Sequence, residues 1–200
     1  MVKRSFDILV SFLALVLLWP FLLTIVILIR VTSHGPALFV QERAGQGGKP
    51  FRFYKFRTMR VEADPYGPSP KAGTDPRLTR IGRFLRETSL DELPQLVNVL
   101  KGDMSLVGPR PLYVAQMAEW DEVQKRRLLV KPGLTGLAQT QGRGTLTREE
   151  KLALDVVYVE SRTLLSDLRL VLRTLLQVCG RRGIYERRYA ENETTRQSRG

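Results

Sequence analysis

The feature that most constrains the fold is an uninterrupted apolar run near the N-terminus. Residues 8–29, ILVSFLALVLLWPFLLTIVILI, are 22 residues without a charge. At about 1.5 Å of rise per residue, a straight helix of this length crosses a hydrocarbon core of about 30 Å. The run is too long for the apolar part of a signal peptide, and no small-residue cleavage site follows it. It therefore predicts a membrane-associated helix.

Two features of this run argue against a simple membrane-spanning helix. Pro20 lies near its middle, where a proline removes a backbone hydrogen bond and crowds the preceding turn. Both flanks are basic, with Lys3 and Arg4 before the run and Arg30 after it, and positive flanks favour the cytoplasmic side. Because a helix bent at Pro20 can enter and leave by one face, we expect a re-entrant helix over 1–30. A kinked spanning helix with a weak charge signal is the alternative.

The net charge of +12 narrows the classes of partner. Residues 1–60 hold nine Lys and Arg against two acids, and residues 181–200 hold six against three. Such a chain suits nucleic acid, an anionic membrane surface or a phosphorylated substrate. The single cysteine, Cys179, excludes an intrachain disulfide. The single histidine, His34, makes a His-rich zinc site or a Ser-His-Asp triad unfavourable.

The rest of the chain predicts one α+β domain that is mostly helical. ALFVQER and FRFYKFRTM, on either side of a glycine-rich turn, predict a small β-hairpin. Residues 62–76 are a Pro- and Gly-rich loop, either a lid or a connection. GDMSLVGPRPL is also expected to be a loop, and KPGLTGLAQTQGRG a glycine-rich turn region.

Helices are expected at 78–87, from Ser89 to about residue 100, at 113–129, from 147 to about 160, and at about 165–179. The last of these suits either the core or the membrane interface. We expect a compact catalytic domain over 31–187 with interfacial helices. A disordered tail is expected over 188–200, where the sequence is polar.

Asp91 and Glu92, in TSLDELPQL, allow two interpretations. Ser89 with Glu92 three residues later matches a capping box, and acids in a first turn suit the helix dipole. Alternatively, the two acids take part in catalysis or bind a ligand. Neighbours on a helix point about 100° apart, so these two cannot flank a glycosidic bond, but both can address one metal ion or one phosphate. A carboxylate can also attack phosphorus and form an acyl phosphate.

Such an attack needs cations that neutralise the phosphate oxygens. The candidates are Arg86, Arg110 between Pro109 and Pro111, and Lys55 with Arg57 in YKFRTM. Arg86 also belongs to a helical stripe with Arg80 and Arg83, for which a solvated face is the alternative. Mg²⁺ would suit the two carboxylates as ligands. The pattern indicates phosphoryl transfer at a membrane surface.

LRETSLDELPQLVNVLKGDMSLVGPRPL, residues 85–112, resembles the signature of the bacterial sugar transferase family, the monotopic phosphoglycosyl transferases. KRSFDILVS, YKFRTM and KPGLTG match further motifs in the family's order. The resemblance therefore runs from the N-terminus to about residue 180. It implies that this chain is the minimal catalytic unit, since larger members carry membrane spans and a further domain ahead of this region.

The resemblance implies transfer of a sugar-1-phosphate from a nucleotide sugar, usually a UDP-sugar, to a polyprenyl phosphate such as undecaprenyl phosphate, with release of the nucleoside monophosphate. Asp91 would be the nucleophile, and Glu92 would assist through Mg²⁺ or by handling protons. Arg86 and the Pro109-Arg110-Pro111 loop would bind phosphate or nucleotide. This reaction would be the first membrane step of a bacterial surface glycan pathway, followed by downstream glycosyltransferases.

The resemblance also implies a location on the cytoplasmic face of the inner membrane, because the family's first helix is re-entrant, bent at a proline and cytoplasmic at both ends. Many members have a serine before that proline, where this sequence has Trp19. Two other classes of function are weighed against the transferase. One is a membrane-anchored basic binding protein, although no nucleic-acid recognition motif is evident. The other is a membrane phosphatase that uses Asp91 and needs no lipid acceptor. The sugar, the final glycan, the exact polyprenol and the oligomeric state are not predicted.

Overall fold

The computed structural model describes residues 2–180 except 68 and 71, so the predicted tail at 188–200 lies outside the described residues. The protein is α+β and mostly helical, as expected. Its helices and strands are α1 (Val2–Thr32), β1 (Leu38–Ala44), β2 (Pro50–Phe56), α2 (Arg80–Glu87), α3 (Gln95–Lys101), β3 (Ser105–Val107), α4 (Glu122–Lys125), β4 (Gly133–Thr135), α5 (Leu137–Gln141), α6 (Arg148–Ser161) and α7 (Leu164–Gly180).

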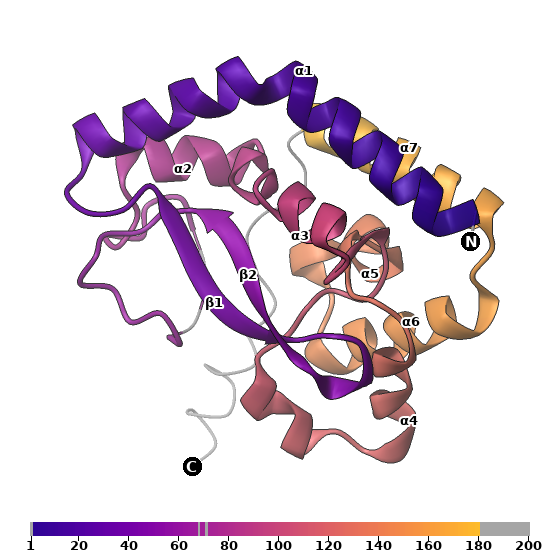
Figure 1. Cartoon of the computed structure of the whole chain (residues 1–200). Coiled ribbons are helices and arrows are strands. Elements are labelled where there is room, and N and C mark those ends of the chain that lie inside the picture. Colours follow the sequence, from indigo (N-terminus) through magenta and orange to yellow (C-terminus); the bar gives the residue numbers. More distant parts are fainter. Residues whose placement is uncertain (1, 68, 71, 181–200) are drawn as a thin grey trace, which may run out of the picture.

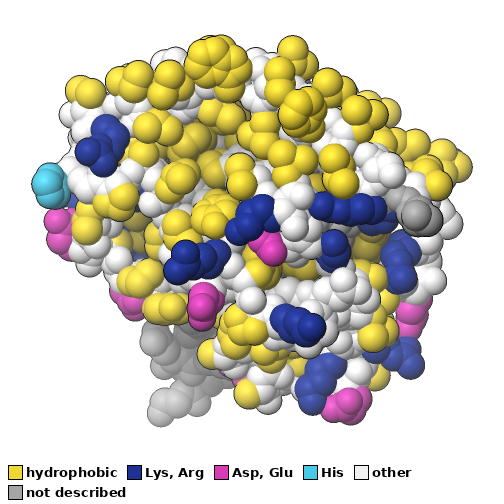
Figure 2. Space-filling model, viewed as in Figure 1, with side chains coloured by type: hydrophobic (Ala, Val, Ile, Leu, Met, Phe, Trp, Pro, Cys, Tyr) yellow, Lys and Arg dark blue, Asp and Glu magenta, His cyan; other side chains and the backbone are white. Residues whose placement is uncertain are grey.

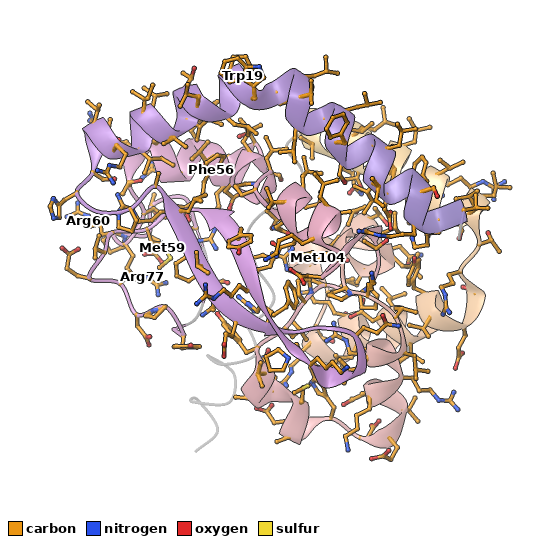
Figure 3. All side chains as sticks on the ribbon, in the orientation of Figure 1. Trp19, Phe56, Met59, Arg60, Arg77 and Met104 are labelled. Atoms are coloured by element: carbon orange, nitrogen blue, oxygen red, sulfur yellow. The ribbon has the colours of Figure 1, made fainter. Side chains whose placement is uncertain are left out.

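Helix α1 runs without interruption through Pro20 and arches over the rest of the molecule (Figure 1). Trp19 lies at the crest of this arch, where its side chain points away from the body (Figure 3) and is 61% exposed. Among the described helices, α1 is the one long and apolar enough to cross a membrane, by length and composition alone. Its four buried residues, Asp7, Ser11, Ile25 and Ile29, lie on either side of the crest.

The N-terminal half of α1 is anchored to the body by polar contacts. Lys3 Nζ lies 2.5 Å from Asp167 Oδ2 of α7. Arg4 donates to the carbonyls of Val99 and Leu100 at the end of α3, which are the orphan acceptors that a helix C-terminus leaves. The buried carboxylate of Asp7 accepts the backbone N–H of Leu106 in β3 at 3.1 Å. Three residues of the KRSFD motif therefore fix the start of the helix.

The C-terminal half of α1 packs on the same body. Ile25 and Ile29 form a buried cluster with Ala37, Phe56 of β2 and Leu85 of α2. A second core cluster lies under the N-terminal half, around Val99, Met104 and Tyr158. Each half of the arch thus covers its own core, and both ends of α1 meet one body from the same side (Figure 1).

The outer face of α1 and a neighbouring face of α7 are apolar and exposed. Figure 2 shows hydrophobic side chains across the upper part of the molecule, with Lys and Arg side chains below them. We call this surface the apolar crest; it comprises Leu9, Phe12, Leu13, Val16, Leu17, Trp19, Phe21, Leu23 and Ile27 of α1 with Leu165, Leu168, Leu172, Leu175 and Leu176 of α7. Soluble proteins seldom expose an apolar surface this continuous.

The predicted hairpin is confirmed as the antiparallel pair β1–β2, with Leu38 opposite Phe56 and Ala44 opposite Pro50. The free edge of β2 is tied to α3 by the fully buried Asn98, which donates to the Arg52 carbonyl and accepts the Tyr54 N–H. Because the Asn98 amide satisfies both backbone groups, β2 is held at a fixed place against α3.

The helix predicted after Thr147 is confirmed. Its capping box forms between Thr147 and Glu150, and α6 follows as expected. The last predicted helix is α7, and α2 begins at an N-cap that Thr79 provides by accepting the Gly82 N–H. These elements carry local sequence signals, and local signals place helix ends well.

Two predictions about the middle of the chain are wrong. The single helix expected over 113–129 is three short pieces, Val114–Glu119, α4 and Arg126–Leu129. The loops expected around GDMSLVGPRPL and KPGLTG contain β3 and β4, which pair in parallel with Ser105 opposite Gly133. Three-residue strands are too short for an alternating pattern to be visible in the sequence.

Candidate active site

The acid pair lies in a short 3₁₀ turn, Leu90–Glu92, between α2 and α3. The capping box expected from Ser89 and Glu92 is wrong: the Ser89 side chain makes no capping hydrogen bond, and α3 begins only at Gln95, after Pro94. Glu92 instead contacts Arg110. Of the two interpretations of TSLDELPQL, the helix-start one therefore fails.

Ser89 has a left-handed backbone, with φ of 57°, and is the only non-glycine residue with positive φ in the described part of the chain. A serine in this region is strained, and such strain is concentrated at functional sites. The turn follows directly on α2, since the Ser89 N–H donates to the Arg86 carbonyl. It redirects the chain so that Asp91 is 2% exposed.

Lys55, from the end of β2, pairs with Asp91. Its Nζ lies 2.5 Å from Asp91 Oδ2, and the two side chains are 14% and 3% exposed. Burial lowers the pKa of Lys55, and the charge of Arg86 lowers it further, whereas Asp91 and Glu92 act in the opposite direction. Asn98 of α3 holds β2, and with it Lys55, next to the turn that carries Asp91. The two charged side chains are therefore kept together.

Arg110 is the exposed residue between two buried prolines, Pro109 and Pro111. Its Nη2 donates to Glu92 Oε1 at 2.9 Å. The backbone around it is held by three hydrogen bonds: the Pro109 carbonyl accepts the Gly133 N–H, the Arg110 carbonyl accepts Arg127 Nη2 at 2.6 Å, and the Leu112 carbonyl accepts the Ala44 N–H. The backbone on both sides of Arg110 is therefore held in place by its neighbours, while the Arg110 side chain contacts Glu92.

Arg127 and Asp155 form a buried pair beneath this loop. Nε and Nη2 of Arg127 donate to Asp155 Oδ2 at 3.1 and 2.7 Å, and both residues are 3% exposed. The Arg127 guanidinium also lies over the ring of Trp120, 4.8 Å from its centroid. Burial raises the pKa of Asp155, and the charge of Arg127 opposes that shift. This pair connects α6 to the backbone of Arg110.

The predicted arginines separate into two groups. Arg86 is half-buried near Lys55 and Asp75, whereas Arg80 and Arg83 of the same stripe are exposed. Arg57 does not join the acid pair: its Nη2 donates to the carbonyl and hydroxyl of Ser33, after α1. The binding of phosphate by Arg57 therefore stays a prediction.

Arg43 is a further cation of this site, and it was not among the residues predicted from the sequence. Arg43 lies on β1 and interacts electrostatically with both Arg110 and Glu92. Burial lowers its pKa, as does the charge of Arg110, whereas Tyr113 and Glu92 raise it. An arginine within a strand of alternating exposure looks like an ordinary surface residue, so no sequence signal marked it.

We call Asp91, Glu92, Lys55, Arg86, Arg110 and Arg43 the charged cluster. It contains two carboxylates and four cations, so its formal charge is positive. Such a site can accept a diphosphate, whose oxygens need this neutralisation. Within the described residues, no group of three or more His, Cys, Asp or Glu side chains could hold a metal alone. Two carboxylates fit Mg²⁺ in its usual role, in which substrate phosphates and water complete the coordination.

The chain belongs to the bacterial sugar transferase family, whose sequence profile matches residues 1–181. It is a transferase. It is 42% identical over 191 residues to the uncharacterized sugar transferase EpsL of Bacillus subtilis, covering 96% of this chain and 94% of that protein. It is 44% identical over 185 residues to the UDP-glucose:undecaprenyl-phosphate glucose-1-phosphate transferase of Caulobacter vibrioides, covering 86% and 68% of the two chains.

A third relative is longer. The galactosyl transferase CpsE of Streptococcus agalactiae is 49% identical over 153 residues, which cover 70% of this chain but 34% of CpsE. The residues that match the family's sequence profile, 1–181, include every member of the charged cluster.

Proposed function

We propose that this protein transfers a sugar-1-phosphate from a UDP-sugar to a polyprenyl phosphate, such as undecaprenyl phosphate, and releases UMP. The relative from Caulobacter is named for a reaction of this type. The observation that carries the proposal is the buried Asp91 carboxylate, which is paired with Lys55 and adjoins Glu92, itself paired with Arg110. A buried carboxylate is costly unless it is paired; here Lys55 pairs with it, and the charged cluster as a whole keeps an excess of positive charge.

In the first step, an Asp91 oxygen attacks the phosphorus bonded to the sugar. The bond from that phosphorus to the bridging oxygen breaks, and UMP leaves with the electron pair. The enzyme then carries an aspartyl phosphosugar. Lys55 holds Asp91 Oδ2, which fixes the rotation of the carboxylate and leaves Oδ1 to attack. Arg86 and Arg110 neutralise the phosphate oxygens as charge develops on the leaving group.

In the second step, a phosphate oxygen of the polyprenyl phosphate attacks the same phosphorus. The bond to Asp91 breaks, and the carboxylate is restored with the polyprenyl diphosphate sugar as product. Glu92 and Asp91 are the residues that would hold Mg²⁺ together with the donor phosphates. Bound there, the ion would supply further neutralisation of the diphosphate charge.

The membrane placement belongs to the same proposal. α1 is re-entrant, the apolar crest lies in the lipid, and the charged cluster faces the cytoplasm. Both ends of α1 contact one body, which a helix that crosses the bilayer could not do with a body on one side only. The exposed leucines of α7 continue the crest, so α7 would lie in the membrane interface.

The test uses wild-type protein with UDP-sugar labelled in the sugar, together with Mg²⁺ and no lipid acceptor. After quenching, we expect a covalent sugar-phosphate adduct on Asp91, and addition of undecaprenyl phosphate should discharge it to lipid. The Asp91→Asn variant should form no adduct and should lose activity by several orders of magnitude, because an amide is a poor nucleophile. A wild-type protein that releases free sugar phosphate without lipid would be a hydrolase, and normal turnover by Asp91→Asn would exclude the covalent mechanism.

A further inference from the structure

Two tyrosines and two polar side chains lie together beside the charged cluster. The rings of Tyr66 and Tyr113 have their centroids 5.8 Å apart with an interplanar angle of 49°. Arg43 lies with its guanidinium carbon 3.7 Å from the centroid of Tyr113. Gln41 precedes Arg43 by two residues on β1, so both belong to the same face of the strand. The proposed chemistry uses none of these rings.

The polar atoms of this group are incompletely satisfied. Gln41 is 5% exposed; its Nε2 donates to the Pro65 carbonyl, but its buried Oε1 has no hydrogen-bond partner among the described residues. In the described part of the chain, the buried Nε of Arg43 also has no acceptor. Buried polar atoms without partners are rare, because each costs about 1–3 kcal/mol of desolvation. One unpaired acceptor and one unpaired donor therefore lie on one face of β1, next to two aromatic rings.

We propose that Tyr66 and Tyr113 clamp the uracil ring of the donor nucleotide, with Gln41 hydrogen-bonding to its edge and Arg43, whose guanidinium covers one face of the Tyr113 ring, supporting that ring. This inference rests on the proposed function, which makes the donor a UDP-sugar. A nucleobase has the matching chemistry, since its faces stack on aromatic rings and its edge carries both donors and acceptors. The uracil N3–H would donate to Gln41 Oε1.

The distances suit a base between the two rings. Two stacking separations of about 3.5 Å need ring centroids about 7 Å apart. Tyr66 and Tyr113 would therefore have to separate by only about 1 Å and become parallel. Tyr66 is 68% exposed and sits in the loop between β2 and α2, so few contacts oppose this adjustment.

The clamp is also at a suitable distance from the reacting phosphate. Tyr113 follows Arg110 by three residues, which span at most about 10 Å of extended chain. That is the scale of a nucleoside diphosphate. Arg43 connects the two regions, because it contacts the Tyr113 ring and interacts with Arg110 and Glu92. The diphosphate would lie on the charged cluster while the base lies in the clamp.

The experiment measures binding of UDP and of inorganic pyrophosphate to the full chain in detergent by calorimetry. The ratio of the two affinities reports the nucleoside end of the ligand. Tyr113→Leu and Tyr66→Leu should each weaken UDP binding about tenfold or more, since stacking on one ring contributes about that factor. Tyr66→Leu should leave pyrophosphate binding unchanged. Tyr113→Leu, which also removes the ring that Arg43 contacts, should weaken pyrophosphate binding less than UDP binding. Tyr113→Phe keeps the ring and should bind UDP within about threefold of wild type.

Tyr54→Leu is the matched control. Tyr54 lies on β2 of the same hairpin, but its ring neighbours Lys101 of α3, and its loss should leave both affinities unchanged. Thermal melting checks that each variant is folded. If Tyr113→Leu does not fold, the result rests on Tyr66→Leu, since Tyr66 is exposed. Wild-type UDP affinity in Tyr66→Leu and Tyr113→Leu would overturn the clamp and leave the proposed function intact. If the wild-type protein binds UDP and pyrophosphate with equal affinity, the clamp would likewise be overturned and the proposed function left intact. A wild-type protein that binds neither would count against the proposed function as well.

Discussion

Lys55 Nζ lies 2.5 Å from Asp91 Oδ2, in a position where neither side chain has much contact with water. A buried ion pair of this kind is tolerated by the fold only while both charges are present. Its attraction roughly offsets the cost of removing two charges from water, whereas one charge left alone bears the full penalty. If Asp91 is the nucleophile, as proposed, its partner lysine is a requirement of the fold as well as of the chemistry.

Lys55→Met should destabilise the protein by about 3 kcal/mol or more, because Asp91 would be left buried without its partner. The double variant Lys55→Met/Asp91→Asn should recover most of that loss, since the uncompensated charge is gone. Urea unfolding in detergent, followed by tryptophan fluorescence, measures both. If the double variant is no more stable than Lys55→Met, the pair does not act on stability as described.

A second buried ion pair, Arg127 with Asp155, lies beneath the Arg110 loop. Here we expect substitutions to affect stability and transfer activity differently. Arg127→Met removes the partner of the buried Asp155 and one donor to the Arg110 carbonyl. Arg127→Met/Asp155→Leu replaces the pair by apolar groups and should restore stability to within about 1.5 kcal/mol of wild type. Transfer efficiency should stay at least about tenfold low in both variants, because the Arg110 backbone has lost a hydrogen bond of about 1.5 kcal/mol.

The measurements are steady-state kcat/KM with a UDP-sugar and undecaprenyl phosphate, together with unfolding curves. Full recovery of kcat/KM along with stability would show that the Arg127–Asp155 pair serves the fold only. Asp91→Asn provides the baseline of an enzyme without its proposed nucleophile.

The sequence predicted the elements that carry their own local signals. The hairpin, the capping box at Thr147 and α7 follow from alternation, capping residues and helical periodicity. The acid pair and three of its cations were also found, because charged residues near a turn are visible in the sequence. Their mutual contacts were not predictable in detail, since Lys55 and Arg110 reach the pair only through tertiary structure.

Other features had no local signal. The parallel pairing of β3 with β4 joins segments far apart in the chain, and each strand has three residues. The left-handed backbone of Ser89 contradicts the capping box that its sequence indicates, because the surrounding packing decides the conformation. Arg43 is recognisable only once β1 lies beside Arg110.

Arg86 and Arg83 allow a matched comparison on one helix. Arg86 is half-buried at the charged cluster, whereas Arg83 is exposed. Arg86→Ala should lower kcat/KM about tenfold to a hundredfold, which corresponds to one charge-assisted hydrogen bond to phosphate. Arg83→Ala should leave it within about twofold, as expected of a solvated side chain. Equal effects in the two variants would remove Arg86 from the site.

Arg110 offers a second comparison, based on geometry rather than exposure. Arg110→Ala should lower kcat/KM by a similar factor. Arg110→Lys should recover only part of that loss, because an ammonium group cannot make two parallel hydrogen bonds to a phosphate. The assay is again kcat/KM for transfer. Complete recovery by lysine would indicate that Arg110 acts as a point charge.

The arch of α1 leads to a prediction about topology. Val2 and His34 are exposed at the two ends of α1, and both ends meet the same body. If the helix is re-entrant, Val2→Cys and His34→Cys, each in a Cys179→Ser background, should both be protected from an impermeant thiol reagent in spheroplasts. Both should react after the membrane is permeabilised. Glu122→Cys, at an exposed site on α4, marks the side on which the body lies. A spanning helix would instead leave Val2→Cys labelled from outside while His34→Cys and Glu122→Cys stay protected, and that pattern would refute the re-entrant arrangement.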